Sequence, residues 1–274
     1  MTNAHTLSAV NLVAGYGEHK IVRDMNLTIP CNKISVIIGA NACGKSTLLK
    51  TLARLIRPLS GEVTLDGAAV DKIPPKRLAR TLGILPQSPT APEGITVSDL
   101  VSRGRYPYQS FMRGFGKSDN EAVAEALEIM GVAELAGHSV DELSGGQRQR
   151  VWIAMALAQQ TDILLLDEPT TFLDVTHQIE ILDLLTDLNM ERGTTIVMVL
   201  HDINLSARYA DYIFALRDGR LVSQGEPEQV VTEATIRSVF SLDCVVAEDA
   251  VSGSPVVLPK GRHHVLTDKK YAVR

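Results

Sequence analysis

One short segment constrains the fold of this chain more than any other feature of its sequence. Residues 39–46 read Gly-Ala-Asn-Ala-Cys-Gly-Lys-Ser, which fits the phosphate-loop pattern G-x-x-x-x-G-K-[ST]. An apolar run at residues 34–38 precedes the segment and a helical pattern follows it, which is the context that the pattern requires. Glycines let backbone N–H groups turn toward phosphate oxygens, and the positive end of a helix favours the same anion. The predicted nucleotide-binding residues here are Gly39, Ala40, Asn41, Ala42, Cys43, Gly44, Lys45, Ser46 and Thr47.

Two side chains of this loop and two carboxylates further along have predicted roles at a phosphate site. Lys45 is expected to reach the β- and γ-phosphates of a nucleotide, and the Ser46 hydroxyl to bind Mg²⁺. Asp167 could hold Mg²⁺ through its hydration shell, and Glu168 could polarise a water for attack on the γ-phosphate. Adjacent carboxylates at a strand end are often only a solvated rim, but the phosphate loop in the same chain favours the catalytic interpretation.

Four apolar runs each end at residues that can carry chemistry. Short apolar runs that alternate with longer amphipathic stretches predict an α/β fold, with a parallel sheet flanked by helices. Ligands of such sheets bind beyond the carboxyl ends of the strands, so we expect the four ends to form one site. The runs are residues 34–38 before Gly39, 82–85 before Pro86 and Gln87, 163–166 before Asp167 and Glu168, and 196–200 before His201.

Two stretches between these runs carry helix signals. Ser118 and Glu121 have the spacing of a capping box before an apolar face, and Gly131 supplies a stop. Residues 175–192 form a longer amphipathic pattern. Its apolar face is made of Ile179, Leu182, Leu185 and Leu188.

At both ends of this alternation of strands and helices, the sequence predicts antiparallel strands. Residues 212–223, with Asp218 and Gly219 at the turn, predict a hairpin. An N-terminal antiparallel β flap is expected as well. Its predicted strands are residues 7–13, 26–29 and 62–66.

The patterns also suggest how the chain is divided. Residues 88–160 are richer in helix signals than their surroundings and could be an inserted helical subdomain. The nucleotide-binding domain is expected to span residues 5–242. Residues 243–274 are then a C-terminal extension.

Composition and charge exclude several classes of protein. The 274 residues are 45% hydrophobic and 22% charged, which is ordinary for a globular chain. A formal net charge of -5 argues against a nucleic-acid partner, because phosphate backbones attract basic surfaces. Three cysteines are too few for a disulfide framework, so we expect a reducing compartment. The first residues lack the apolar run of a secretory signal, and no stretch approaches the ~20 apolar residues that span a bilayer.

A further segment, Leu143-Ser144-Gly145-Gly146-Gln147, stands before a predicted helix and presents free N–H groups to a second anion. With the phosphate loop, the strand-end Asp-Glu and the later strand-end His, in this order, the chain resembles the nucleotide-binding subunit of an ABC transporter. The resemblance covers about residues 7–225. It implies an ABC ATPase: a P-loop NTPase with a parallel core sheet, an N-terminal antiparallel β flap and an inserted helical subdomain, which binds ATP and Mg²⁺.

The resemblance also implies roles for single residues. By position, Tyr16 would stack on adenine, and Gln87 would contact Mg²⁺ and sense the membrane partner. Glu168 would be the catalytic base and His201 would hold the γ-phosphate. Asp174 would join the two sites of a dimer. Taken singly, Tyr16 suits a core or surface position and His201 a satisfied strand-end histidine; their spacing from the other motifs favours the functional interpretation.

The implied assembly is a head-to-tail homodimer that encloses two ATP molecules. Each nucleotide would lie between the phosphate loop of one subunit and the L-S-G-G-Q segment of the other. The residues concerned in that segment are Ser144, Gly145, Gly146 and Gln147.

Three positions depart from the family pattern, and one loop residue is a cysteine. Ala40 and Ala42 stand where the family often has Pro and Gly, and Thr171 replaces a common Ser. We expect Ala42 to be tolerated because its position avoids strongly glycine-only dihedrals. Cys43 lies near a helix N-terminus, which favours the thiolate, and the alternative is a small loop filler. In either case a maleimide there would occupy the space of the phosphates, so alkylation should abolish hydrolysis and bound Mg·ATP should protect.

Three segments narrow the branch of the family. Residues 104–108, 171–180 and 200–211 together resemble ATPase subunits of bacterial importers for iron–siderophore complexes, haem and vitamin B12. That resemblance implies a peripheral subunit on the cytoplasmic face of the cell membrane, bound to a permease dimer that a substrate-binding protein feeds. Residues 87–116 would hold the coupling helix of the permease. An exporter subunit remains an alternative, and a soluble ABC ATPase is a weaker one, because those chains usually carry two such domains, a coiled coil or zinc-binding cysteines.

Overall fold

A six-stranded sheet lies at the centre of the structure, a computed structural model that describes residues 4–109, 114–171 and 173–263. Phe172 and residues 264–274 of the predicted C-terminal extension lie outside the described residues. The strand order is β10-β9-β3-β8-β7-β6, and neighbouring strands from β9 to β6 run parallel while β10 is antiparallel to β9. The predicted parallel core is therefore confirmed. The strands are β3 (Ile34–Gly39), β6 (Leu82–Leu85), β7 (Ile163–Asp167), β8 (Thr195–Val199), β9 (Tyr212–Arg217) and β10 (Arg220–Gly225).

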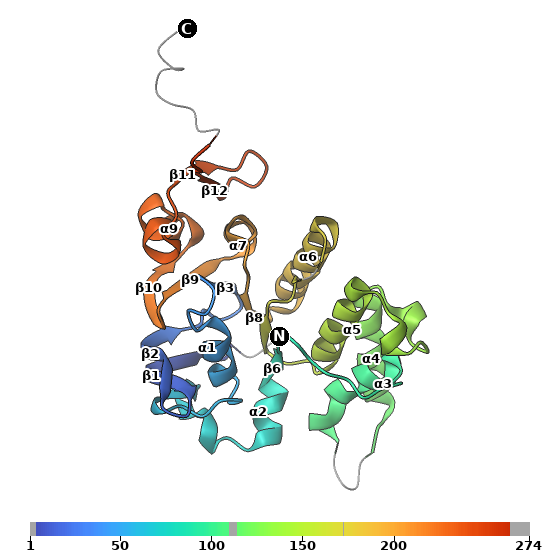
Figure 1. Cartoon of the computed structure of the whole chain (residues 1–274). Coiled ribbons are helices and arrows are strands. Elements are labelled where there is room, and N and C mark those ends of the chain that lie inside the picture. Colours follow the sequence, from blue (N-terminus) through green and yellow to red (C-terminus); the bar gives the residue numbers. More distant parts are fainter. Residues whose placement is uncertain (1–3, 110–113, 172, 264–274) are drawn as a thin grey trace.

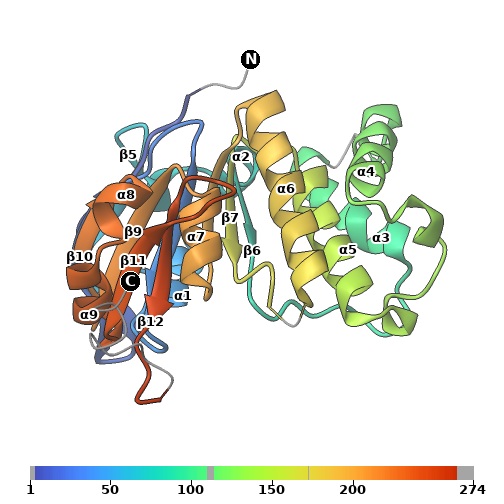
Figure 2. The same ribbon diagram turned by 90° about the horizontal axis from the view of Figure 1, so that it is seen from above.

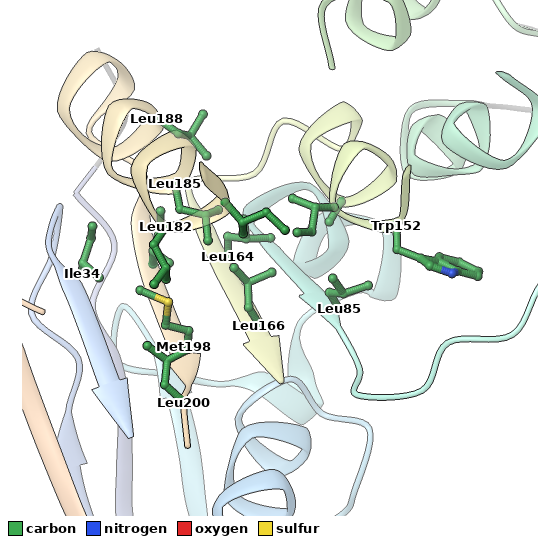
Figure 3. Packing of buried hydrophobic residues seen from close by; sticks show 14 of the residues in the cluster. Ile34, Leu85, Trp152, Leu164, Leu166, Leu182, Leu185, Leu188, Met198 and Leu200 are labelled. Atoms are coloured by element: carbon green, nitrogen blue, oxygen red, sulfur yellow. The ribbon is translucent and has the colours of Figure 1, made fainter. Parts of the chain in front are cut away.

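The core strands are buried on both faces, which explains why they read as continuous apolar runs. One face packs against α5 (Gly145–Ala158) and α6 (Val175–Arg192), so that Trp152 and Leu166 belong to the same cluster (Figure 3). The opposite face packs against α1 (Lys45–Leu52) and the flap. Alternate residues of each strand thus serve two different cores.

The N-terminal antiparallel flap is confirmed as a four-stranded sheet of order β2-β1-β4-β5. Its first two strands are longer than predicted. Asn11 and Asp24 have positive φ values and the pairing register shifts near Asn11, so the two-residue alternation that marks a strand in sequence is broken there. The strands are β1 (Leu7–Tyr16), β2 (His19–Thr28), β4 (Ser60–Leu65) and β5 (Ala68–Ala69).

Helices α3, α4 and α5 gather on the side of the molecule opposite the flap (Figures 1 and 2). α3 spans Val97–Ser102 and α4 spans Lys117–Ile129, with a 3₁₀ turn at Arg103–Tyr108 between them. In Figure 2, α6 lies between this helical group and the strands of the central sheet. The helical part that was predicted within residues 88–160 is present.

The capping box predicted for α4 is wrong. Ser118 is the second residue of the helix rather than its cap, and Glu121 is not the box partner. The helix begins after Gly116, whose N–H donates to the Asp119 carboxylate at 3.0 Å. Asp119 also accepts from the Arg105 guanidinium at 2.9 Å, and this ion pair is buried. The tertiary partner thus decides which carboxylate caps the helix.

The predicted helix at residues 175–192 is confirmed at both ends. Asp174 caps it through the N–H of His177, and Gly193 ends it with φ 65 in the left-handed region. Among the described residues no helix combines the length and apolarity that crossing a membrane requires. The other helices are α2 (Pro75–Thr81), α7 (Ile203–Tyr209), α8 (Pro227–Val230) and α9 (Glu233–Phe240), with 3₁₀ turns at Val70–Lys72, Ala133–Leu135 and Val140–Glu142.

A separate two-stranded hairpin follows the central sheet. Its strands β11 (Cys244–Glu248) and β12 (Pro255–Pro259) pair with each other and pack against α7 and α9. Figures 1 and 2 both show the hairpin beside α7. The described part of the C-terminal extension is therefore folded against the main body.

Candidate functional site

The phosphate loop joins the end of β3 to the start of α1. A Cβ atom at Gly39, which has φ 156, would lie 2.4 Å from the carbonyl oxygen of Leu216, so only glycine fits there. Lys45 is buried, and its ammonium donates hydrogen bonds to the carbonyl oxygens of Gly39 at 2.8 Å and Ala40 at 3.0 Å. These bonds use two of its three donors and keep the cation against the loop. One donor remains for an anion.

Ala42 has φ 61, in the left-handed region that favours glycine. This region is disfavoured for alanine but is not restricted to glycine, so the expectation that alanine is tolerated here stays a prediction. The region is open to alanine at a cost of about 1–2 kcal/mol, so the loop keeps its shape with some backbone strain.

Cys43 does not have the reactive environment that its place in the loop suggested. Its side chain is only 5% exposed and belongs to the apolar cluster between the central sheet and the flap. Burial raises the pKa of the thiol, and the positive charge of Lys45 offsets this effect only in part. The predicted thiolate is thus contradicted, and the alternative of a small residue that fills the loop is favoured.

Ser46 and Asp167 form a second part of the site. The Ser46 hydroxyl donates a hydrogen bond to Oδ1 of Asp167 at 2.9 Å, while Oδ2 of Asp167 is buried with no hydrogen-bond partner. Burial raises the pKa of Asp167, against the hydrogen bond from Ser46 and the positive charge of Lys50. A hydroxyl and an unsatisfied carboxylate oxygen side by side are the donor set that Mg²⁺ prefers. The residues present therefore fit this cation.

Glu168 is the meeting point of three side chains. The Gln87 amide donates to its Oε2 atom at 2.7 Å, the Thr171 hydroxyl to the same atom at 3.0 Å, and His201 Nε2 lies 2.6 Å from Oε1. Glu168 is 7% exposed and has φ 57, another non-glycine residue in the left-handed region. Such strain at a buried carboxylate is typical of functional positions.

Glu168 and two of its partners, Gln87 and His201, come from the ends of neighbouring strands. Gln87 follows β6, Glu168 follows β7 and His201 follows β8, so the structure brings together the strand ends that the sequence marked. Gln87 contacts Glu168 in this structure, and no contact with the Ser46–Asp167 pair is seen among the described residues. Its contact with Mg²⁺ stays a prediction.

Thr171 is the functional contact that the sequence missed. It was noticed only as a replacement for serine, yet its hydroxyl holds the carboxylate of Glu168. The spacing of three residues after a strand-end acid is the signal that could have indicated this contact. A hydroxyl at that distance can reach back across a tight turn, here closed by the Thr171 N–H on the Glu168 carbonyl at 3.3 Å.

The L-S-G-G-Q segment forms the capped start of α5. The Ser144 hydroxyl accepts from the N–H of Gln147 at 3.3 Å, and the Gln147 side chain accepts from the N–H of Ser144 at 3.1 Å. Ser144, Gly145 and Gln147 are exposed. The segment thus presents a helix N-terminus at the surface of the molecule.

Two further predicted residues lie at the surface. Tyr16 ends β1 and is 52% exposed, so a face of its ring is open to a stacking partner. Asp174 is exposed and accepts from both the backbone N–H and Nδ1 of His177. These hydrogen bonds lower the pKa of Asp174, which keeps a negative charge at the start of α6.

The chain is similar to several known proteins. The sequence profile of the family described as "ABC transporter" matches residues 22–171. The chain is 54% identical over 256 residues to the "Probable siderophore transport system ATP-binding protein YusV" of Bacillus subtilis (strain 168), a match that covers 93% of each chain. It is 49% identical over 256 residues to the ferric enterobactin transport ATP-binding protein FepC of Escherichia coli (strain K12), covering 93% of this chain and 94% of that one. A solved dimeric structure of MJ0796, a bacterial ABC transporter cassette, superposes with a TM-score of 0.72 at 30% identity, covering 80% of this chain and 98% of that one.

Proposed function

The chain belongs to the ABC transporter family, whose ATP-binding subunits are ATPases coupled to transport, and we propose that it powers the uptake of iron–siderophore complexes through a separate membrane permease. The substrate class rests on the names of the similar proteins, which are siderophore and ferric enterobactin transport subunits. One observation carries the catalytic part: the buried carboxylate of Glu168, held by Gln87, Thr171 and His201 beside the Ser46–Asp167 pair.

The phosphate loop and Tyr16 of the flap would bind the nucleotide. The backbone N–H groups of residues 40–47 and the Lys45 ammonium would surround the phosphates, and the exposed ring of Tyr16 would cover the adenine. Ser46 and Asp167 would hold Mg²⁺ at the unsatisfied carboxylate oxygen. When bound, the cation would neutralise charge that develops on the phosphate oxygens.

Hydrolysis requires an open acceptor site on the Glu168 carboxylate. Gln87 and Thr171 both donate to Oε2 and only His201 contacts Oε1, so Oε1 is the oxygen that would take a proton from the attacking water, and it would be fully open once His201 turns away. His201 is 47% exposed, so its imidazole can turn from Oε1 toward the γ-phosphate without loss of packing. After this exchange His201 would bind the γ-phosphate, and the Glu168 carboxylate would bind the attacking water.

A second subunit would complete each site. The exposed start of α5 carries the Ser144 hydroxyl and the N–H groups of Gly145 and Gly146, which would suit a γ-phosphate held by a partner's loop. Similar cassettes are dimeric, as in MJ0796. We therefore propose a head-to-tail homodimer that closes over two ATP molecules on the cytoplasmic face of the membrane, with a permease dimer as partner and a substrate-binding protein acting through that permease.

The test couples purification with transport. A tagged chain, purified from the membranes of its own host, should copurify with a permease and, in proteoliposomes with that permease, should drive ATP-dependent uptake of a radiolabelled ferric siderophore. Glu168→Gln should copurify equally but transport nothing. Uptake of haem or cobalamin in place of the siderophore, or movement in the export direction, would contradict the proposed substrate or direction.

A further inference from the structure

The segment at residues 200–211 marked the branch of the family, yet only His201 has a place in the proposed reaction. His201 directly precedes Asp202, which caps α7 by accepting from the N–H groups of Asn204 at 2.8 Å and Leu205 at 2.9 Å. The Ser206 hydroxyl also donates to the Asp202 carbonyl at 2.6 Å. His201 is therefore attached to α7 through a rigid cap, and any shift of α7 moves it.

The side chain of Asn204 joins α7 to the C-terminal hairpin. Its Oδ1 accepts from the N–H of Val257 at 2.8 Å, and its Nδ2 donates to the Val257 carbonyl at 3.3 Å. One amide thus satisfies both main-chain groups of a single residue, as a neighbouring strand would do. Since β12 pairs with β11 on its other edge, Asn204 occupies the edge that would otherwise be unpaired.

Both partners are fixed in place. Val257 is 4% exposed and belongs to the large core cluster, so the hairpin cannot move without disturbing that core. At the other end of α7 the Tyr209 hydroxyl donates to Asp183 of α6 at 2.8 Å. Burial and this hydrogen bond raise the pKa of Tyr209 to about 12, so the phenol remains a donor. α7 is thus held at its start by the hairpin and at its end by α6.

We propose that Asn204 is a positioning residue, through which the β11–β12 hairpin sets the position of His201 and thereby the rate of ATP hydrolysis. The proposal rests on the proposed role of His201 at the γ-phosphate. In this proposal the C-terminal extension, which lies outside the matched family profile, helps to position a residue of the reaction. Asn204 itself contacts neither nucleotide nor water in this scheme.

The experiment compares Asn204→Ala with a matched control. Asn26 makes two hydrogen bonds of the same kinds and lengths to two different residues, since its Oδ1 accepts from the N–H of Asn11 at 2.8 Å and its Nδ2 donates to the Asp24 carbonyl at 3.3 Å. Both asparagines are exposed, so both alanine variants should fold. Urea unfolding should show similar losses of stability. Steady-state hydrolysis of ATP, measured on the whole chain, should show a kcat lowered about tenfold for Asn204→Ala with KM within about twofold, and near-normal kcat for Asn26→Ala.

A double-mutant cycle identifies the route. If Asn204 acts through His201, then adding Asn204→Ala to His201→Ala should lower kcat no further, so the two effects should be far from additive. Equal kcat values for Asn204→Ala and Asn26→Ala, or two losses that simply multiply, would overturn the inference and leave the proposed function intact. A normal kcat in His201→Ala alone would overturn the role of His201, and the inference with it.

Discussion

The imidazole of His201 and the carboxylate of Glu168 meet at 2.6 Å, although the two residues are 33 positions apart in sequence. They follow β8 and β7, adjacent parallel strands whose register pairs Val199 with Asp167. The sheet therefore delivers both groups to the same level of its edge. In the proposed reaction His201 would bind the γ-phosphate, so hydrolysis would require this contact to open.

Glu168→Gln tests the proposed base. Glutamine keeps the size of the side chain but cannot accept the proton of a water, so kcat should fall at least about 100-fold. Binding of ATP should persist, because Lys45 and Ser46 are untouched, and a closed dimer should accumulate in size-exclusion chromatography with ATP. Glu134→Gln, at an exposed position away from the site, is the matched control. Near-normal turnover in Glu168→Gln would refute the assignment.

Mixing two variants tests whether each site is shared between subunits. Lys45→Ala should weaken nucleotide binding in its own chain, whereas Ser144→Arg should leave binding intact and block closure, because a bulky cation replaces a small phosphate contact. Neither variant alone should dimerise with ATP. A heterodimer of the two would contain one site with both changes and one unchanged site, so light scattering should show some ATP-dependent dimer on mixing. Its absence would argue against the shared-site arrangement.

Cys43 should resist alkylation in the folded chain. Its side chain is buried and burial raises its pKa, whereas Cys31 is partly exposed. With a maleimide at neutral pH, mass spectrometry of the digested protein should find Cys31 labelled first, and Cys43 only after urea is added. Fast labelling of Cys43 in the native chain, with protection by Mg·ATP, would restore the reactive-thiol hypothesis that the structure contradicts.

The buried ion pair of Arg105 and Asp119 should stabilise the helical part of the fold. Asp119→Ala leaves a buried guanidinium without its carboxylate and should lower the free energy of unfolding by about 3–5 kcal/mol. Glu121→Ala is the control: its pair with Lys117 is exposed and spans 3.7 Å, so it should matter by less than about 0.5 kcal/mol. Chemical denaturation followed by circular dichroism gives both values. Similar effects of the two substitutions would contradict this interpretation.

Elements with strong local signals could be predicted from the sequence. The core strands are apolar on both faces, and α6 is bounded by a capping Asp174 and a left-handed Gly193, so pattern and structure agree. The start of α4 could not be predicted in this way, because Asp119 and Glu121 each have the spacing to cap a nearby residue. The buried Arg105, which the sequence does not place beside them, holds Asp119 at the cap.

In the site too, the sequence predicts which residues take part but not how tertiary packing orients them. The loop pattern locates Cys43 in the chain but carries no information about which side of the loop the thiol faces, and packing against the flap turns it inward. The φ value of Ala42 follows from the turn between β3 and α1, which the residue type alone opposes. Gln87 and His201 reach Glu168 from two other strand ends that only the sheet order brings together, whereas Thr171 reaches it from the same loop.

Trp152 is the only tryptophan of the chain, and it lies buried in α5. Its intrinsic emission therefore reports on the surroundings of α5 and needs no introduced label. If the start of α5 engages a partner's nucleotide by a rigid movement of α3, α4 and α5 together, the emission maximum should stay fixed while ATP binds. If α5 instead loosens from its neighbours, the maximum should shift to longer wavelength, so one native fluorophore distinguishes two ways of closing the dimer.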